Sequence, residues 1–293
     1  MRASEWIQSG FATILAITAW VYPIALRRRL TITLLAACAV VAVDLARLSE
    51  YVLQPIQASI LRDWLPVPLM LIPYWQAGQF FRGPNEKIQA RLMKIDRSVF
   101  DLMSRLGWTF GAFARLTLEW AYMLCYPLVP MGLATLYAAG LRRYANTFWF
   151  FVLVPTYLCY AITPFVPALP PRSVGSQGTG PSSMESRALR NSRVFNLWIL
   201  KHGSIQAISF PSAHVASALA VSLVLLHYVP IAGIVFLVVA FWIAVAAVVG
   251  GQHYVIDLVL GAAIALALDM VWRVHLIPST VLTAPAIALV ALL

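Results

Sequence analysis

The sequence predicts an all-α protein, a polytopic transmembrane helical bundle of about eight or nine membrane helices with one amphipathic interfacial helix. Composition supplies two of the reasons, because 61% of the 293 residues are hydrophobic and only 11% are charged, whereas soluble proteins carry about 25% charged residues. The third reason is the pattern, in which apolar runs near the ~20 residues that a membrane-spanning helix needs follow one another along the chain. We therefore expect one membrane domain without a separate soluble module.

The net charge of +10 indicates an anionic partner. The lysines and arginines are spread among short loops between apolar runs, so we expect the partners to be membrane lipids and an anionic lipid substrate, and not nucleic acid. Cys38, Cys125 and Cys159 all lie within apolar runs and lack metal-ligand spacing. They predict neither a disulfide nor a metal site, and the oligomeric state stays open.

The first three apolar runs lie at about residues 11–26, 30–48 and 64–81. Arg27-Arg28-Arg29 closes the first run, and because these charges follow the run instead of preceding it, we interpret it as a retained span and not as a signal peptide. Prolines interrupt the third run at Pro66, Pro68 and Pro73. This run is therefore predicted to be either a kinked span or a re-entrant segment.

Residues 84–108 differ from the apolar runs because they mix apolar and charged side chains. Apolar side chains recur there at three- and four-residue steps, from Ile88 to Leu106, among lysines and arginines. This pattern predicts an amphipathic helix with basic residues, suited to lie in the membrane interface. Further apolar runs follow at about residues 114–139, 148–168, 215–228, 231–249 and 255–270, with a weaker one at 277–293.

Two of the late runs each begin beside a histidine. His253 precedes Asp257 by four residues, and positions i and i+4 share one face of a helix, so the carboxylate can hold the imidazole ring. A nucleophilic imidazole works best when a carboxylate fixes its tautomer. His253 is therefore the candidate nucleophile, and His214, which has no acidic residue near it in sequence, is the candidate proton donor.

Residues around these histidines could bind a phosphate. Arginine offers phosphate a two-pronged donor. The candidate ligands of this kind in the polar stretch of residues 170–209 are Arg172, Arg187, Arg190 and Arg193. Pro211 and Ser212 stand where a helix would start, and the amide groups of a helix start bind phosphate well. The Ser212 hydroxyl can add another donor.

The order of the apolar runs predicts that these polar stretches meet. If the run after His214 crosses the membrane and the next run crosses back, the His253 stretch returns to the face where His214 began. Pro170-Pro171-Arg172, at the exit of the preceding run, lies on that face too.

Two short motifs resemble a known family. Pro-Ser-x-His at residues 211–214 and His-x-x-x-Asp at 253–257 are similar to the second and third signature motifs of the type 2 phosphatidic acid phosphatase superfamily. The form His-Tyr-x-x-Asp, with Pro-Pro-Arg at 170–172, is most similar to the branch containing inositol phosphorylceramide synthase and sphingomyelin synthase. The resemblance covers residues 84–270.

The resemblance implies a domain organisation around a six-helix catalytic core. Membrane helices outside the family core would occupy residues 1–83 and the interfacial helix residues 84–108. The catalytic membrane core would follow at 109–276, with a C-terminal apolar segment at 277–293.

The resemblance also implies a phosphohistidine mechanism that needs no cofactor or metal. His253 would attack the phosphorus, and Asp257 would orient the ring and stabilise its positive charge. His214 would protonate the leaving oxygen and then activate the acceptor.

The phosphoryl oxygens would be bound by Ser212, the Ala213 amide and Arg172. One departure from the family stands out: Ala246-Ala247 replaces the Ser-Arg that the phosphatase branch has ahead of its last histidine. A phosphate ligand is therefore missing or is supplied by Arg190, Arg193, Lys201 or Gln252.

We expect a lipid phosphate phosphatase. The alternatives are a phosphotransferase that moves a phosphorylated headgroup between lipids, as inositol phosphorylceramide synthase does, and a non-enzymatic transporter or scaffold. The protein is expected to be a multi-pass protein of the plasma (inner) membrane. Counting Lys and Arg would place the catalytic face in the cytoplasm, whereas the resemblance implies an extracytoplasmic active site, which we expect.

Overall fold

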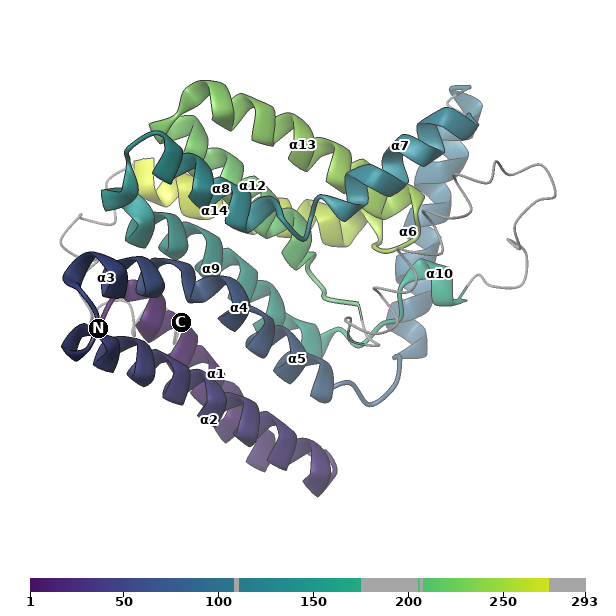
Figure 1. The fold of residues 1–293 in the computed structure, drawn as a ribbon. Coiled ribbons are helices and arrows are strands. Elements are labelled where there is room, and N and C mark those ends of the chain that lie inside the picture. The colour runs from purple at the N-terminus through teal and green to yellow at the C-terminus, as the bar shows by residue number, and fades with distance from the viewer. Residues whose placement is uncertain (108–110, 175–204, 206–207, 274–293) are drawn as a thin grey trace.

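The computed structural model describes residues 1–107, 111–174, 205 and 208–273. All regular secondary structure in these ranges is helical, which confirms the all-α prediction. Most helices run side by side along one direction, and helix α6 (Glu86–Arg105) crosses their ends at a steep angle (Figure 1).

Four helical segments of the described chain are long and apolar enough to cross a membrane, and a bent pair of helices would make a fifth. The four are Leu26–Tyr51, Arg142–Phe165, Pro230–Val249 and Val255–Arg273. These segments fit a protein embedded in a membrane. The number of eight or nine membrane helices stays a prediction, and the C-terminal segment expected at 277–293 lies outside the described residues.

The N-terminal part begins with α1 (Ala3–Val21) and α2 (Leu26–Leu48), which pack against each other. The first apolar run was predicted at residues 11–26, whereas α1 begins at Ala3 and ends at Val21. Arg27-Arg28-Arg29 does not follow this helix directly but lies in the first turns of α2. The chain leaves the helical conformation at Tyr22, whose φ and ψ are −82° and 142°, because the following Pro23 disfavours a helical residue before it.

The third run is broken into short helices, as its prolines predicted. After a 3-10 turn, η1 (Ser49–Tyr51), come α3 (Pro55–Trp64), α4 (Pro66–Leu69) and α5 (Leu71–Gln79). Pro55 and Pro66 each stand at the first position of a helix, where a missing N–H costs little. Helices α1 and α5 both pack against α9 (Ala145–Ile162), which joins this part to the rest of the protein.

Helix α12 (Ala213–Tyr228) lies at the centre of the remaining helices. It packs against α9, α13 (Pro230–Val249), α14 (Val255–Arg273) and α8 (Leu128–Ala138), and most of its side chains are buried. Helix α13 by contrast leaves large apolar side chains such as Ile231, Ile234 and Phe241 exposed. An apolar outer face is what a helix in contact with lipid requires.

The run predicted at 114–139 is one segment in sequence but two helices in space. Helix α7 (Ala112–Met123) and α8 are bent by 65° at a short break. Pro127 immediately precedes α8, and a proline within the run removes a backbone donor and disturbs the preceding turn.

Helix α6 fills most of the predicted segment 84–108. Asn85 caps it by accepting hydrogen bonds from the N–H groups of Lys87 and Ile88, at 3.1 and 3.2 Å. Gln89 and Asp96 are buried against the bundle, whereas the lysines and arginines of the helix are exposed. Its place in the membrane interface remains a prediction.

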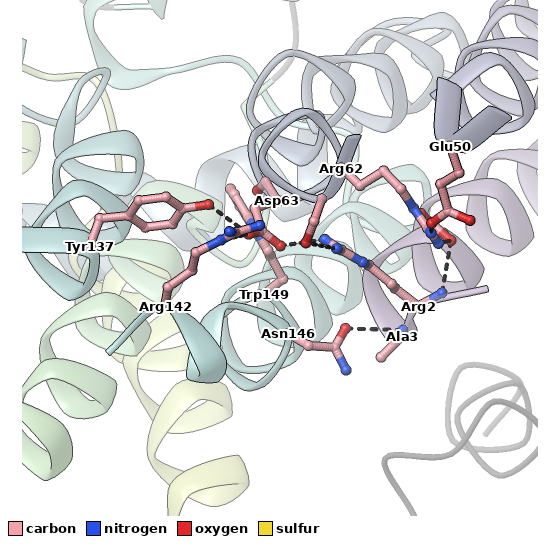
Figure 2. Close-up of polar contacts among 11 residues, drawn as sticks. Arg2, Ala3, Glu50, Arg62, Asp63, Tyr137, Arg142, Asn146 and Trp149 are labelled. Carbon is pink, nitrogen blue, oxygen red and sulfur yellow. Dashed lines mark hydrogen bonds and ion pairs between the residues drawn. The ribbon is translucent and has the colours of Figure 1, made fainter. Parts of the chain in front are cut away.

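A polar network ties the N-terminal helices to the core (Figure 2). Asp63, near the end of α3, accepts hydrogen bonds from Tyr137 Oη at 2.6 Å and Arg142 Nε at 2.8 Å, and it forms an ion pair with Arg2. Its backbone carbonyl accepts a 2.7 Å bond from Trp149 Nε1. Through its carboxylate and its backbone carbonyl, Asp63 thus joins α3 to the residue before α1, to α8, to the 3-10 turn η2 (Arg142–Tyr144) and to α9.

A second ion pair in this network is almost fully buried. Arg62 meets Glu5 through two parallel bonds, Nε to Oε1 at 2.6 Å and Nη2 to Oε2 at 2.8 Å, and also pairs with Glu50. Two-pronged pairing satisfies both buried groups. Both clusters lie near the start of α9, so they occupy the end of the bundle opposite the loop that follows α9.

Candidate active site

His253 and Asp257 form a buried contact. His253 Nδ1 lies 3.0 Å from Asp257 Oδ2, and the two residues are 4% and 0% exposed. Only Asp257 is helical, because α14 begins at Val255, so the expectation of two residues on one helix face needs correction. His253 instead reaches the carboxylate from the turn ahead of the helix.

Backbone contacts hold that turn in place. The carbonyl of Ala247 accepts bonds from Gln252 N at 2.8 Å and His253 N at 3.1 Å. Gly251 has φ +65°, a left-handed conformation that glycine adopts without strain. The turn therefore returns the chain sharply from α13 and directs His253 towards Asp257.

His214 lies beside His253. Their ring centroids are 5.7 Å apart, and the rings are inclined by 69°. The rings of Tyr122 and Tyr126 each lie 6.3 Å from His214, and among the described residues His214 Nδ1 has no hydrogen-bond partner. Nothing in the sequence distinguishes these two tyrosines from the other aromatic residues of the apolar runs.

Ser212 connects the two histidine segments. Its N–H donates to the backbone carbonyl of Asp257 at 2.9 Å, and its hydroxyl accepts from Val215 N at 3.4 Å and caps α12. This cap agrees with the helix start predicted at Pro211 and Ser212. The bond from Val215 N uses one lone pair of the Ser212 hydroxyl, so the hydroxyl proton can still be donated to a ligand. Asp257 thus holds His253 by its side chain and Ser212 by its backbone.

Arg172 reaches the same place. It lies in the short helix α10 (Pro171–Val174), and its N–H donates to the Gly251 carbonyl at 3.0 Å. Burial lowers the pKa of the Arg172 guanidinium, and the nearby Tyr122, Tyr126 and Tyr74 oppose this effect. The structure therefore brings all three polar stretches together at one end of the bundle.

The remaining predicted phosphate ligands either are buried or lie outside the described residues. Gln252 is buried, and its Oε1 finds no hydrogen-bond partner in the described part of the chain. Ala246 and Ala247 are buried among apolar side chains. Arg190 and Arg193 lie outside the described residues, as do Arg187 and Lys201.

The chemistry of this assembly is that of a phosphate site. It combines two imidazoles, a carboxylate on one of them, an arginine and the first turn of α12, whose amide groups lack helical partners. Within the described ranges, no group of three or more His, Cys, Asp or Glu side chains could hold a metal ion.

Comparison with known proteins supports this assessment. The sequence model of a family described as the PAP2 superfamily matches residues 90–271, more than half of the chain. The match begins within α6 and ends within α14, so it contains both histidines, Asp257 and Arg172. No curated protein and no solved structure gave a significant match.

Proposed function

The chain belongs to the PAP2 superfamily, and from this membership and its two neighbouring histidines we propose that it is a membrane enzyme that hydrolyses a lipid phosphate. The observation that carries the proposal is the 3.0 Å contact of His253 Nδ1 with Asp257 Oδ2, on a ring whose centroid lies 5.7 Å from that of His214. An oriented imidazole beside a second imidazole is suited to nucleophilic catalysis with acid–base assistance.

The first step forms a phosphohistidine. The Asp257 carboxylate accepts a hydrogen bond from the Nδ1–H of His253, which keeps the proton on Nδ1 and leaves the lone pair on Nε2. Nε2 attacks the phosphorus, and an N–P bond forms while the bond from phosphorus to the lipid oxygen breaks. Protonated His214 gives its proton to that oxygen, so the lipid leaves as an alcohol.

The second step releases the phosphate. Neutral His214 takes a proton from water as the water oxygen attacks the phosphorus. The N–P bond breaks, inorganic phosphate departs, and both histidines return to their starting protonation states.

Donors near the histidines bind the phosphoryl oxygens in this mechanism. We assign Arg172, the Ser212 hydroxyl and the Ala213 amide to this role, because charged and backbone donors at a helix start stabilise charge that develops on phosphate. In this proposal Gln252, Arg190, Arg193 or Lys201 supplies the ligand that is missing at Ala246-Ala247.

A second candidate function is transfer to another lipid. Ala246 and Ala247 are buried among apolar residues, where the phosphatase branch carries Ser-Arg. This departure, together with Pro-Pro-Arg at 170–172, favours a phosphotransferase of the inositol phosphorylceramide synthase kind. In that reaction a lipid alcohol replaces water in the second step.

The experiment is a turnover assay of purified protein with phosphatidic acid and lipid-linked headgroup donors, read as released phosphate or transferred headgroup. We expect His253→Ala to lower the rate at least about 1000-fold, because the nucleophile is lost. His227→Ala is the matched control, since His227 lies on the same helix as His214 but is exposed at its far end. Equal turnover by His253→Ala and the wild type would refute the catalytic assignment and leave a transporter or scaffold.

An added alcohol acceptor separates the two reactions. Phosphate release that is unaffected by acceptor supports hydrolysis, and formation of a new phosphodiester supports transfer. With substrate labelled on phosphorus, an acid-labile and alkali-stable label on the protein, absent from His253→Ala, would identify the phosphohistidine.

We further propose that the protein is a multi-pass protein of the plasma (inner) membrane, with α6 in the interface and the active site on the extracytoplasmic face. Its partners in this proposal are membrane lipids, with no nucleic acid, cofactor or metal. The steep crossing of α6 over the bundle ends supports the interfacial position (Figure 1).

Cysteine labelling tests the sidedness. Ser173 and Ala139 are exposed beyond opposite ends of α9, a helix of 18 residues and hence about 27 Å long. Cys38 is exposed and would first be replaced by alanine. We expect an impermeant maleimide to label Ser173→Cys in intact cells and Ala139→Cys only after permeabilisation, and the opposite pattern would place the site in the cytoplasm.

A further inference from the structure

We propose that Gln89 and Asp96 of helix α6 are positioning residues, which hold the His253 turn and the Arg172 segment in register from outside the site. This inference rests on the proposed function. The hydrogen bonds of both side chains go to Leu169, Tyr254 and Val255 and not to His253, His214 or the Arg172 guanidinium, so each would act through the segment that it binds.

Asp96 caps α14 from a different helix. Its Oδ1 accepts a hydrogen bond from Val255 N at 2.9 Å, and Asp96 is buried. Val255 is the first residue of α14, where amide groups lack helical partners and the preceding residue often supplies a cap. The residues before it, His253 and Tyr254, lack a capping side chain of that kind, so the cap comes from α6.

The position of this cap gives it influence over the nucleophile. Val255 stands between His253 and Asp257, two residues from each. The bond from Asp96 thus fixes the backbone between the two members of the catalytic contact. A carboxylate is costly to bury, and burial raises the pKa of the Asp96 carboxyl, with the Val255 N–H acting in the opposite direction.

Gln89 joins α6 to two further segments. Its Oε1 accepts from Leu169 N at 2.8 Å, and its Nε2 donates to the Leu169 carbonyl at 3.3 Å and to the Tyr254 hydroxyl. The Tyr254 hydroxyl in turn donates to the same Leu169 carbonyl at 3.0 Å. Gln89 and Tyr254 are both buried, so the three residues form a closed set of bonds.

This set ties the phosphate ligand to the nucleophile. Leu169 lies three residues before Arg172, and Tyr254 directly follows His253. The two segments also meet where Arg172 N donates to the Gly251 carbonyl at 3.0 Å. Both segments are therefore anchored on α6, and loss of these bonds would let the nucleophile shift relative to Arg172.

The test measures kcat and KM separately for phosphatidic acid, together with the rate at which phosphohistidine forms in a single turnover. A 1 Å misplacement of reacting groups costs about 100-fold in rate. We therefore expect Asp96→Ala to lower kcat and the rate of phosphohistidine formation about 10- to 100-fold, with KM within about threefold. Asp96→Asn should recover most of the rate, because its amide oxygen can accept the same bond from Val255 N.

Asp101→Ala is the matched control, since Asp101 is an exposed acidic residue of the same helix, and we expect wild-type kinetics. Wild-type kcat in folded Asp96→Ala would overturn the inference, as would equal loss in Asp96→Asn and Asp96→Ala. If Asp96→Ala cannot be purified, Gln89→Ala decides in its place: reduced kcat at an unchanged melting temperature supports the inference, and wild-type kcat overturns it. Failure of the proposed function is distinct, because the wild type would then turn over no lipid phosphate.

Discussion

Gly261 tests whether the two histidine segments must pack at backbone distance. It lies on α14 one turn after Asp257, facing Ser212. A Cβ placed on Gly261 would stand 2.4 Å from the Ser212 carbonyl oxygen, whereas ordinary contact begins at 3.4 Å, so Gly261→Ala requires a separation of about 1 Å. The obstacle is backbone and cannot rotate away as a flexible side chain would.

The size of the effect follows from that displacement. The bond from Ser212 N to the Asp257 carbonyl is 2.9 Å long, and lengthening it by about 1 Å breaks it, at a cost of about 1 kcal/mol. Overpacking adds about 1–3 kcal/mol to the loss of stability. Because the same movement shifts Asp257 and the start of α12 apart, we expect kcat/KM to fall about 100-fold.

The assay is phosphate release from phosphatidic acid, with the melting temperature measured on the same samples. Gly10→Ala is the matched control, because a Cβ on Gly10 meets nothing within 4 Å; it should keep full activity and gain slightly in stability. Wild-type kcat/KM in Gly261→Ala would refute the reasoning. Equal losses in both variants would show that helix glycines matter for a reason other than contact with Ser212.

Two further predictions concern the opposite end of the bundle and the choice of chemistry. Asp63→Asn should lower the free energy of unfolding by about 3 kcal/mol, or the melting temperature by roughly 6–12 °C, because it leaves Arg2 and Arg142 without their carboxylate. Asp44→Asn is the control, since it removes an exposed ion pair with Arg47 at 3.0 Å, and we expect it to change stability by less than about 1 kcal/mol. In both variants kcat of the folded enzyme should stay unchanged, and a large fall in Asp63→Asn would contradict the separation of this network from the active site. Addition of a metal chelator should leave turnover intact, since phosphohistidine chemistry needs no metal, and abolished activity that added metal restores would refute the mechanism.

Several features of the site could be predicted from the sequence because they depend on short spacings. The four-residue step from His253 to Asp257 limits how far apart their side chains can lie, and the structure places them in contact at 3.0 Å. The order of the apolar runs was enough to predict that Arg172, His214 and His253 gather at one end of the bundle. The helix at 86–105 was also predicted, but its periodicity says nothing about what its buried face contacts.

The contacts between distant segments could not be predicted in this way. Gln89 and Leu169 are 80 residues apart, and Asp96 and Val255 are 159 apart. An apolar or amphipathic helix can pack against many neighbours, so its sequence does not identify the polar group that it will meet. The same holds for Tyr122 and Tyr126 beside His214, and for Asp63 in its network.

The sequence by itself determined the helical class, the membrane setting and the histidines that begin two of the late helices. Composition and spacing decide these features, because the bilayer requires apolar helices and a carboxylate must lie close to the imidazole that it orients. Tertiary structure alone decided that Asp96 of α6 caps α14, the helix that follows His253, and that the Ser212 backbone packs directly against Gly261. Close packing makes these choices, because helices approach at backbone distance only where a residue as small as Gly261 makes room, and a buried group such as the Val255 N–H needs a hydrogen-bond partner.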